Sequence, residues 1–236
     1  MNGFCSQNAV NLATVQQVAV PEATATWSPV AYGAAIDFMK DTAMERLGLD
    51  IKSEAYGLNK DGSQMFGRFT LDTGDAEKGL SIGFRQSYNK SLALGVAVGA
   101  NVFVCDNLMF SGDAFKVVRK NTKFVWADFQ RLVSEQVGEA LANYDLLKAQ
   151  TDRMKATPCH KQRGDALLGV AIGKGLLTPH QASVAFGDWE KPRYEEFSDR
   201  NVWGLYNAVT EGLKKGGPGS VLDRHAAAHD FFVAAA

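Results

Sequence analysis

The sequence has few cysteines and no long apolar run, and both shortages limit the class of protein to which it can belong. Its three cysteines, Cys5, Cys105 and Cys159, are an odd number without the spacing of a disulfide framework. We therefore expect free thiols in a reducing compartment. The apolar stretches are shorter than the roughly 18 residues that a membrane span needs. No cationic segment precedes an apolar run at the N-terminus, so we expect no signal peptide, no membrane partner and a cytoplasmic location.

The sequence also lacks a strong excess of charge of either sign. The net charge is −1 at pH 7, which argues against a surface that is basic throughout. The charges are unevenly spread, because residues 116–163 hold ten Lys and Arg against five Asp and Glu, a net of +5. This segment is either a solvated helix face with extra lysines or a surface that faces a polyanion.

Length and apolar content predict an ordinary folded chain. The 236 residues suit one domain with an elaborated end or two small domains, and the 46% of apolar residues can form a substantial core. We expect a flexible N-terminal arm over residues 1–30, an α+β core over 31–157 and a helical region over 158–236 that packs on the core.

Helical spacing and turn signals predict a helix followed by a sheet. Apolar residues between Ala34 and Leu47 recur at helical spacing, and Gly48 follows as a C-cap. Two runs, Ile51–Leu58 and Gln64–Leu71, flank an Asp-Gly pair that is typical of a hairpin turn. Further strands are expected at Leu80–Arg85, within Ser91–Val104, and at Phe110–Val118. These runs predict an antiparallel meander.

The second half of the chain is predicted to be helical. Apolar residues from Trp126 to Leu147 recur about every 3.5 positions, which predicts one long helix that ends before Pro158, covers the sheet and buries Trp126 and Tyr144. A contact with another subunit is the alternative use of this apolar stripe. Shorter helices are expected at Gly164–Leu177, Pro179–Trp189, Asn201–Lys215 and Ser220–Val233. The expected fold class is thus α+β, an antiparallel sheet meander covered by a long helix and followed by a C-terminal helical cluster.

Two short motifs are similar to catalytic or nucleotide-binding signatures but lack their remaining parts. Ser87 and Lys90 have the spacing of the Ser-x-x-Lys motif of penicillin-binding enzymes, yet neither of the two companion motifs occurs. Residues 169–175 approach a phosphate-binding loop, but Gly175 stands where a Ser or Thr should bind magnesium. We therefore assign no catalytic residue and lean towards a protein that is not an enzyme.

His225 and His229 are the one pair with the spacing of metal ligands. Four residues apart on a helix, they would share a face, as two imidazole ligands of a transition metal do. Asp223 and Asp230 sit beside the pair, but no Glu follows His225 and the other two histidines, His160 and His180, are remote in sequence, so we expect structural or surface histidines. A metal enzyme at this pair is the least favoured hypothesis, and we predict no metal and no cofactor.

Basic residues beside aromatic ones are more suggestive of function. Strand residues that alternate cations and rings at a sheet edge can follow a phosphate backbone and stack bases. The candidate nucleic-acid-binding residues are Arg68, Arg85, Lys116, Arg119, Lys120 and Lys123. A sheet with a charged, solvated outer face is the alternative interpretation of the same pattern.

Two stretches of the sequence resemble a known family. The first comprises Gly83–Ser91, Val102–Gly112 and Arg119–Thr122, and the second comprises Trp189, Pro192, Glu196, Phe197, Arg200, Trp203–Glu211, Lys214, Arg224, His225 and Asp230. From about Leu80 onwards they resemble the uncharacterised phage/plasmid-like protein family, a domain of unknown function common in prophages and plasmids. The resemblance implies a mobile-element origin and a setting in the host cytoplasm, and it transfers no catalytic residue. The Ser-His-Asp block usual in that family reads Ser87-Tyr88-Asn89 here.

Two hypotheses of function therefore remain open. The first is a non-enzymatic, DNA-associated protein of a phage or plasmid that binds single strands and forms an oligomer. The second is a protein-binding module that acts on a host defence or replication factor, which the low net charge favours.

Overall fold

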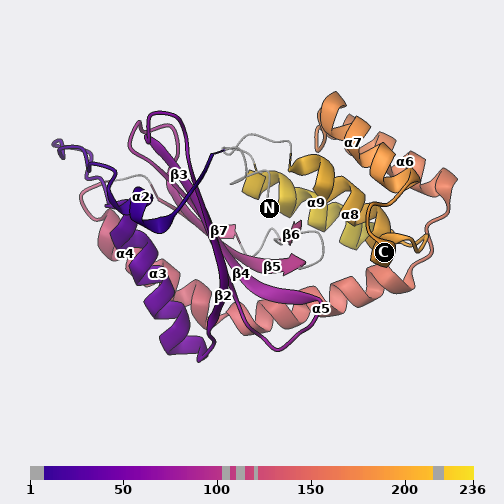
Figure 1. Ribbon diagram of the computed structural model, residues 1–236, viewed down its shortest axis with the longest axis horizontal. Coiled ribbons are helices and arrows are strands. Elements are labelled where there is room, and N and C mark those ends of the chain that lie inside the picture. The colour runs from indigo at the N-terminus through magenta and orange to yellow at the C-terminus, as the bar shows by residue number, and fades with distance from the viewer. Residues whose placement is uncertain (1–7, 103–106, 110–114, 120–121, 215–220) are drawn as a thin grey trace.

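The computed structural model describes residues 8–102, 107–109, 115–119, 122–214 and 221–236, and the side chains of residues 101–121, 221 and 222 lie outside the description. Within the described residues the fold is α+β, as predicted (Figure 1). The strands are β1 (Ala9–Val10), β2 (Ile51–Leu58), β3 (Gln64–Leu71), β4 (Lys78–Ser87), β5 (Leu94–Val102), β6 (Asn107–Met109) and β7 (Phe115–Arg119). The α-helices are α2 (Leu12–Gln16), α3 (Tyr32–Leu47), α4 (Val125–Gly138), α5 (Ala140–Ala156), α6 (Lys161–Gly173), α7 (Pro179–Glu190), α8 (Val202–Leu213) and α9 (Val221–Ala235), with a short 3₁₀ helix at Glu195–Phe197.

The described strands form one antiparallel sheet in the order β1-β2-β3-β4-β5-β6, and β7 pairs with β5 beside β6. The predicted turn joins β2 to β3, where Gly62 takes a φ of 69° and its N–H bonds the Asn59 carbonyl at 3.0 Å. This left-handed conformation is easy for glycine, which has no Cβ to clash. Since each strand from β2 to β5 pairs with the next one in sequence, the predicted meander is confirmed.

One face of the sheet carries the largest apolar side chains. Phe69, Ile82 and Val98 lie in register across β3, β4 and β5, and each is fully buried. Helices α3 and α4 lie on one side of the sheet in Figure 1, and α4 adds Phe129 to the same core cluster. The C-terminal helices α6 to α9 lie on the other side, with α5 running between the two sides along the base of the sheet.

The predicted long helix is interrupted. Helix α4 ends at Gly138 and α5 begins at Ala140, so the expectation of one continuous helix from residue 123 to 157 is wrong. Gly138 is a poor helix former, and the ψ of Glu139 is −4°, whereas an α-helix has a ψ of about −42°. Helical hydrogen bonding nevertheless spans the junction, because the Glu139 N–H donates to the Glu135 carbonyl and the Asn143 N–H donates to the Glu139 carbonyl.

The two aromatic residues predicted to be buried on that helix differ in their environment. Tyr144 on α5 is buried, and its hydroxyl donates to the Lys78 carbonyl at 3.0 Å, so α5 is tied to the first residue of β4. Trp126 is only half-buried, against Phe38 and Phe129, which corrects the prediction of a buried ring. It lies in the first turn of α4.

The segment predicted as an N-terminal arm contains structure from residue 8 onwards. Strand β1 pairs with β2, and Val15 of α2 is fully buried in the main core. Residues 17–31 then lead along the surface to α3 without a helix or strand. The division into an arm, a core and a C-terminal region stays a prediction.

The C-terminal cluster is packed around α8, in which every residue from Val202 to Leu213 is buried. Its contact with α7 is close at Gly212, where a Cβ would lie 2.5 Å from the Gln181 carbonyl oxygen. At its end, α9 is held by Arg163, whose guanidinium donates to the Ala235 carbonyl at 2.6 Å. In the described part of the chain, no helix is both long and apolar enough to cross a membrane.

Cys159 agrees with the expectation of a free thiol. It is fully buried between the core and the C-terminal helices, and burial raises the pKa of its thiol. A neutral, inaccessible thiol is a poor nucleophile, so Cys159 behaves as a packing residue. Cys5 and Cys105 lie outside the described residues.

The close contact between α7 and α8 gives a test of the fold. We expect Gly212→Ala to lower the free energy of unfolding by about 1–3 kcal/mol, because the new methyl group would meet backbone that cannot move aside cheaply. Gly169→Ala is the matched control, since that α6 position has open space around it, and we expect a gain of about 0.5–1 kcal/mol. Urea denaturation of both variants measures the two effects. Equal changes in the two variants would contradict this packing of α7 on α8.

Candidate nucleic-acid interface

The two predicted arginines in the sheet are buried. Arg68 and Arg85 share the face opposite Phe69, and they are 6% and 8% exposed. Arg68 donates to the Thr70 hydroxyl at 3.1 Å, and Arg85 lies 3.5 Å from a carboxylate oxygen of Asp223 on α9. The Arg68 guanidinium is thus bonded within β3 and that of Arg85 lies beside α9, and phosphate contact stays a prediction for both.

The four predicted residues further along the chain belong to β7 and to the segment that follows it. For Lys116 and Arg119 the structure describes the backbone of β7, in which Arg119 pairs with Leu94, but not the side chains. Lys120 lies outside the described residues. Lys123 is exposed just before α4.

A cavity of about 460 Å³ lies where three segments meet. The segment joining α2 to α3 provides Thr26 and Trp27, the turn joining β4 to β5 provides four residues, and Thr122 precedes α4. The full lining is Thr26, Trp27, Lys90, Ser91, Leu92, Ala93 and Thr122. We call this cavity the Trp27 cleft. Its volume lies within the range of small-ligand sites, about 300–1,000 Å³.

The turn between β4 and β5 is held by side-chain hydrogen bonds. The Ser87 hydroxyl donates to the Leu92 carbonyl at 3.0 Å and accepts from the Leu92 N–H at 2.8 Å. Asn89 accepts from the Ser91 N–H and donates to the Ser63 hydroxyl on the neighbouring turn. At the tip, Lys90 has a φ of 63°, and in the described part of the chain it is the one residue other than glycine with a positive φ.

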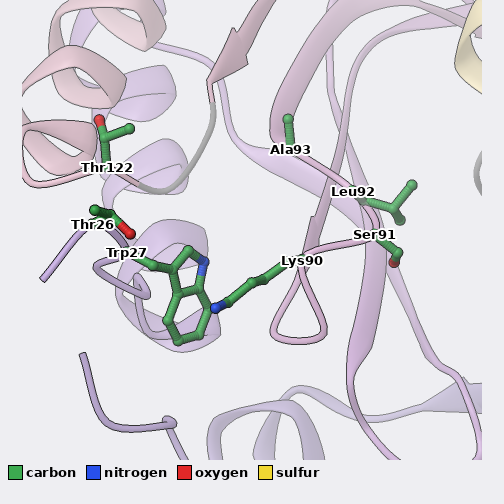
Figure 2. Close-up of a pocket in the computed structure, with 7 residues that line it drawn as sticks. All are labelled: Thr26, Trp27, Lys90, Ser91, Leu92, Ala93 and Thr122. Carbon is green, nitrogen blue, oxygen red and sulfur yellow. The ribbon is translucent and has the colours of Figure 1, made fainter. Parts of the chain in front are cut away.

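Lys90 reaches from this turn to the ring of Trp27. Its ammonium lies 4.9 Å from the centroid of the indole ring, within range of a cation–π contact. Figure 2 shows the two side chains pointing toward one another across the cleft. Trp27 is half-buried and its carbonyl accepts from the Thr24 N–H at 2.8 Å, so a tight turn fixes the backbone that carries the ring.

A second cavity of about 230 Å³ continues along the same two segments. It is lined by Ser28, Pro29, Val30, Ala31, Ala34, Lys123, Val125 and Trp126. Phe124, which stands between the lining residues Lys123 and Val125 in the sequence, is 70% exposed, which is unusual for a large apolar side chain. None of the residues that line the two cavities is an Asp or Glu, while both linings include a lysine and a tryptophan. The pair of cavities therefore suits a ligand that is anionic and aromatic.

Sequence reasoning found Lys123 but missed Trp27 and Lys90. Trp27 lay in the predicted arm, and Lys90 was considered only as a partner of Ser87. No sequence signal links the two residues, because the fold brings them together through contacts that are distant along the chain.

The Ser-x-x-Lys spacing does not form a catalytic pair here. The Ser87 hydroxyl is buried and bonded to Leu92, while the Lys90 ammonium lies over Trp27. The glycine-containing run at residues 169–173 lies within α6 rather than between a strand and a helix, as a phosphate-binding loop would.

His225 and His229 are both buried on α9. His229 Nε2 lies 2.8 Å from the Gln150 side-chain oxygen, and the imidazole packs edge-on against Tyr206. The described residues include no group of three His, Cys, Asp or Glu side chains placed to hold a metal ion. Burial lowers the pKa of His229 to about 4, so it is a neutral core residue at pH 7.

Comparison with known proteins gives one match. Residues 24–231 match the model of a family described as Domain of unknown function (DUF932). No curated protein and no solved structure matches the chain.

The buried imidazole of His229 predicts a pH dependence of stability. Below its usual pKa of 6.5 the unfolded chain gains a proton that the folded chain does not gain until about pH 4, so stability falls over this interval. We expect a loss of about 3 kcal/mol from this residue between pH 6.5 and pH 4. In His229→Gln the free energy of unfolding, measured with urea at several pH values, should depend less on pH over that interval. His180→Gln, at an exposed position of α7, should leave the dependence unchanged.

Proposed function

Because the chain belongs to the DUF932 family, whose description assigns no function, we propose one from the site itself: a non-enzymatic protein that binds single-stranded DNA at the Trp27 cleft. The single observation that carries this proposal is the Lys90 ammonium 4.9 Å from the Trp27 ring inside a cavity of about 460 Å³. An indole face can stack any base, and an adjacent ammonium can pair with the phosphate.

The position of the ring favours a single strand. Trp27 lines a cavity between three segments and does not stand on an open convex surface. A base must leave its duplex partner and its stacked neighbours to reach such a ring, and that step costs least in a strand already unpaired. The exposed hydroxyls of Thr26 and Thr122 offer further hydrogen bonds to sugar or phosphate oxygens.

Basic residues near the cleft support a longer binding path for the single-stranded DNA. Lys123 lines the second cavity, and β7 leads toward it with its last residue, Arg119, paired with Leu94 next to the cleft. The predicted residues Lys116 and Arg119 thus belong to the strand that runs to this end of the sheet. A local basic track of this kind is compatible with a chain whose net charge is −1.

The biological setting is part of the proposal. The resemblance of Gly83–Ser91 and Trp203–Glu211 to the phage/plasmid-like family supports a mobile-element protein in the host cytoplasm. The first of these blocks contains the Lys90 turn, so the resemblance and the cleft involve the same residues. Oligomerisation along a strand, which is common in proteins of this kind, belongs to the same proposal.

A protein-binding module remains the second candidate. The observation that favours it is the exposed apolar pair on α6, Val170 at 47% and Ile172 at 37%, together with Leu146 on α5 at 52%. Such residues bind partners when they form one contiguous patch. The Trp27 cleft combines shape, charge and an aromatic ring, whereas these residues offer apolar area alone, and so we place DNA binding first.

The first test is a substitution at the ring. Trp27→Ala should weaken binding to a labelled oligodeoxynucleotide of about 16 nucleotides by roughly 5- to 100-fold, as the loss of a base-stacking residue does. Trp27→Phe keeps a ring and should lose much less. Fluorescence anisotropy at low salt measures both affinities, and a duplex of the same sequence should bind more weakly than the single strand. Absence of binding by the unmodified protein at micromolar concentration would reject this function and favour the protein-binding module.

The second test concerns the basic segment. Replacing Arg119 and Lys120 with Ala should weaken binding irrespective of base sequence, and should flatten the slope of log affinity against log salt by about 0.7 for each lost phosphate contact. A melting temperature that barely changes would show that the weaker binding is not a loss of folding. Lys174→Ala, on exposed α6 surface away from the cleft, is the matched control and should leave the slope unaltered.

A further inference from the structure

We propose that Lys90 is a displaceable cap on the Trp27 indole: it covers the ring in the free protein and moves to a phosphate when a base takes its place. This inference rests on the proposed function and deepens it, because it makes one nucleotide, a base with its own phosphate, the unit that the cleft recognises. The ligand class is therefore a phosphorylated strand with unpaired bases, and neither a free base nor a bare anion satisfies the site.

The backbone of Lys90 is fixed, which leaves the side chain as the moving part. Both backbone groups of Leu92 bond the Ser87 hydroxyl, and Ser91 is held by Asn89 and by Gln64, whose amide donates to the Ser91 hydroxyl at 2.7 Å. These bonds anchor the turn to β4 and to the first residue of β3. The side chain of Lys90, by contrast, is exposed and consists of four carbons joined by rotatable bonds.

The left-handed backbone of Lys90 is energetically unfavourable for a lysine, and the turn does not need a lysine at this position. At a φ of 63° a side chain with a Cβ is strained, and glycine would adopt the same turn freely. Strain of this kind persists where the surrounding structure enforces it, and it concentrates at functional positions. Among the described residues, the tip of this turn thus carries the one residue other than glycine with a positive φ, and its ammonium lies over the candidate stacking ring.

The relative strength of the contacts favours exchange. A cation–π contact between an exposed lysine and an indole is weak beside the stacking of a base on the same ring. The ammonium gains a stronger partner when it leaves the ring for a phosphate, since both groups then carry full charges. No carboxylate lines the cleft to hold the ammonium in place, because its described lining contains no Asp or Glu.

Variants at Lys90 separate the contribution of its charge from that of the ring. Lys90→Gly should weaken binding of the labelled oligodeoxynucleotide and reduce the salt slope by about 0.7, one phosphate on a single strand. Lys90→Arg should keep the slope. Trp27→Ala should weaken binding while leaving the slope unchanged, because the ring contributes no charge. The melting temperature of Lys90→Gly should not fall, since glycine relieves the strained φ, so a loss of binding in this variant is not a loss of folding.

The movement itself has a spectroscopic signature. Protons of the Lys90 side chain near the ammonium lie over an aromatic ring in the free protein, so the ring current should shift their NMR signals upfield. The signals are identified as those that vanish in Lys90→Gly. On addition of the unlabelled oligodeoxynucleotide they should return to ordinary lysine positions.

The outcomes distinguish this inference from the function on which it rests. If the oligodeoxynucleotide binds but the Lys90 signals stay shifted upfield, or if Lys90→Gly keeps the full salt slope, Lys90 remains on the ring and only the displacement is wrong. If the unmodified protein does not bind the oligodeoxynucleotide at low salt, the function and the displacement fail together. A reduced slope in Lys90→Gly with unshifted signals in the complex supports both.

Discussion

The pairing of β4 on both of its edges is the constraint on which the rest of the structure depends. All ten residues from Lys78 to Ser87 are buried, with β3 on one side and β5 on the other. A central strand with both faces covered requires a layer of helices on each side, and the chain supplies α3 and α4 first and the C-terminal cluster last. The two ends of β4 then position α5 and the β4–β5 turn. The Lys78 carbonyl accepts a hydrogen bond from the Tyr144 hydroxyl of α5, and the Ser87 hydroxyl bonds Leu92 across the turn that carries Lys90.

The candidate site lies where this rigid frame ends and irregular segments begin. The three segments of the Trp27 cleft are a connection between helices, a strand turn and the approach to α4, none of which is regular structure. Each is nonetheless tied to the frame, for example by the two bonds between Ser87 and Leu92. Loops on a rigid scaffold are common places for binding residues, because their side chains can vary while their positions are held.

Local signals predicted the fold well, and non-local contacts decided the site. Strands β2 and β3 have the predicted bounds because their alternation and the turn at Gly62 are encoded within about twenty residues. The break at Gly138 was missed, since apolar spacing continues across it and outweighs one glycine. Arg68 and Arg85 were expected to be accessible, either at a sheet edge that binds nucleic acid or on a solvated face, but both side chains are buried. Trp27 and Lys90 are brought into contact by tertiary packing alone, and the spacing of apolar residues in the sequence does not predict such contacts.

The face of the sheet that carries Arg68 and Arg85 is mostly polar, and this affects what the chain exposes while it is being synthesised. The meander from β2 to β5 pairs neighbours in sequence, so it can assemble before α8 and α9 are synthesised. During that interval the face that α9 later approaches through Asp223 stays uncovered. On β3 and β4 it carries Arg68, Thr70, Ser81, Arg85 and Ser87, with Phe66 as the one large apolar side chain. Water can solvate the polar groups, so this face exposes little apolar surface until its cover arrives.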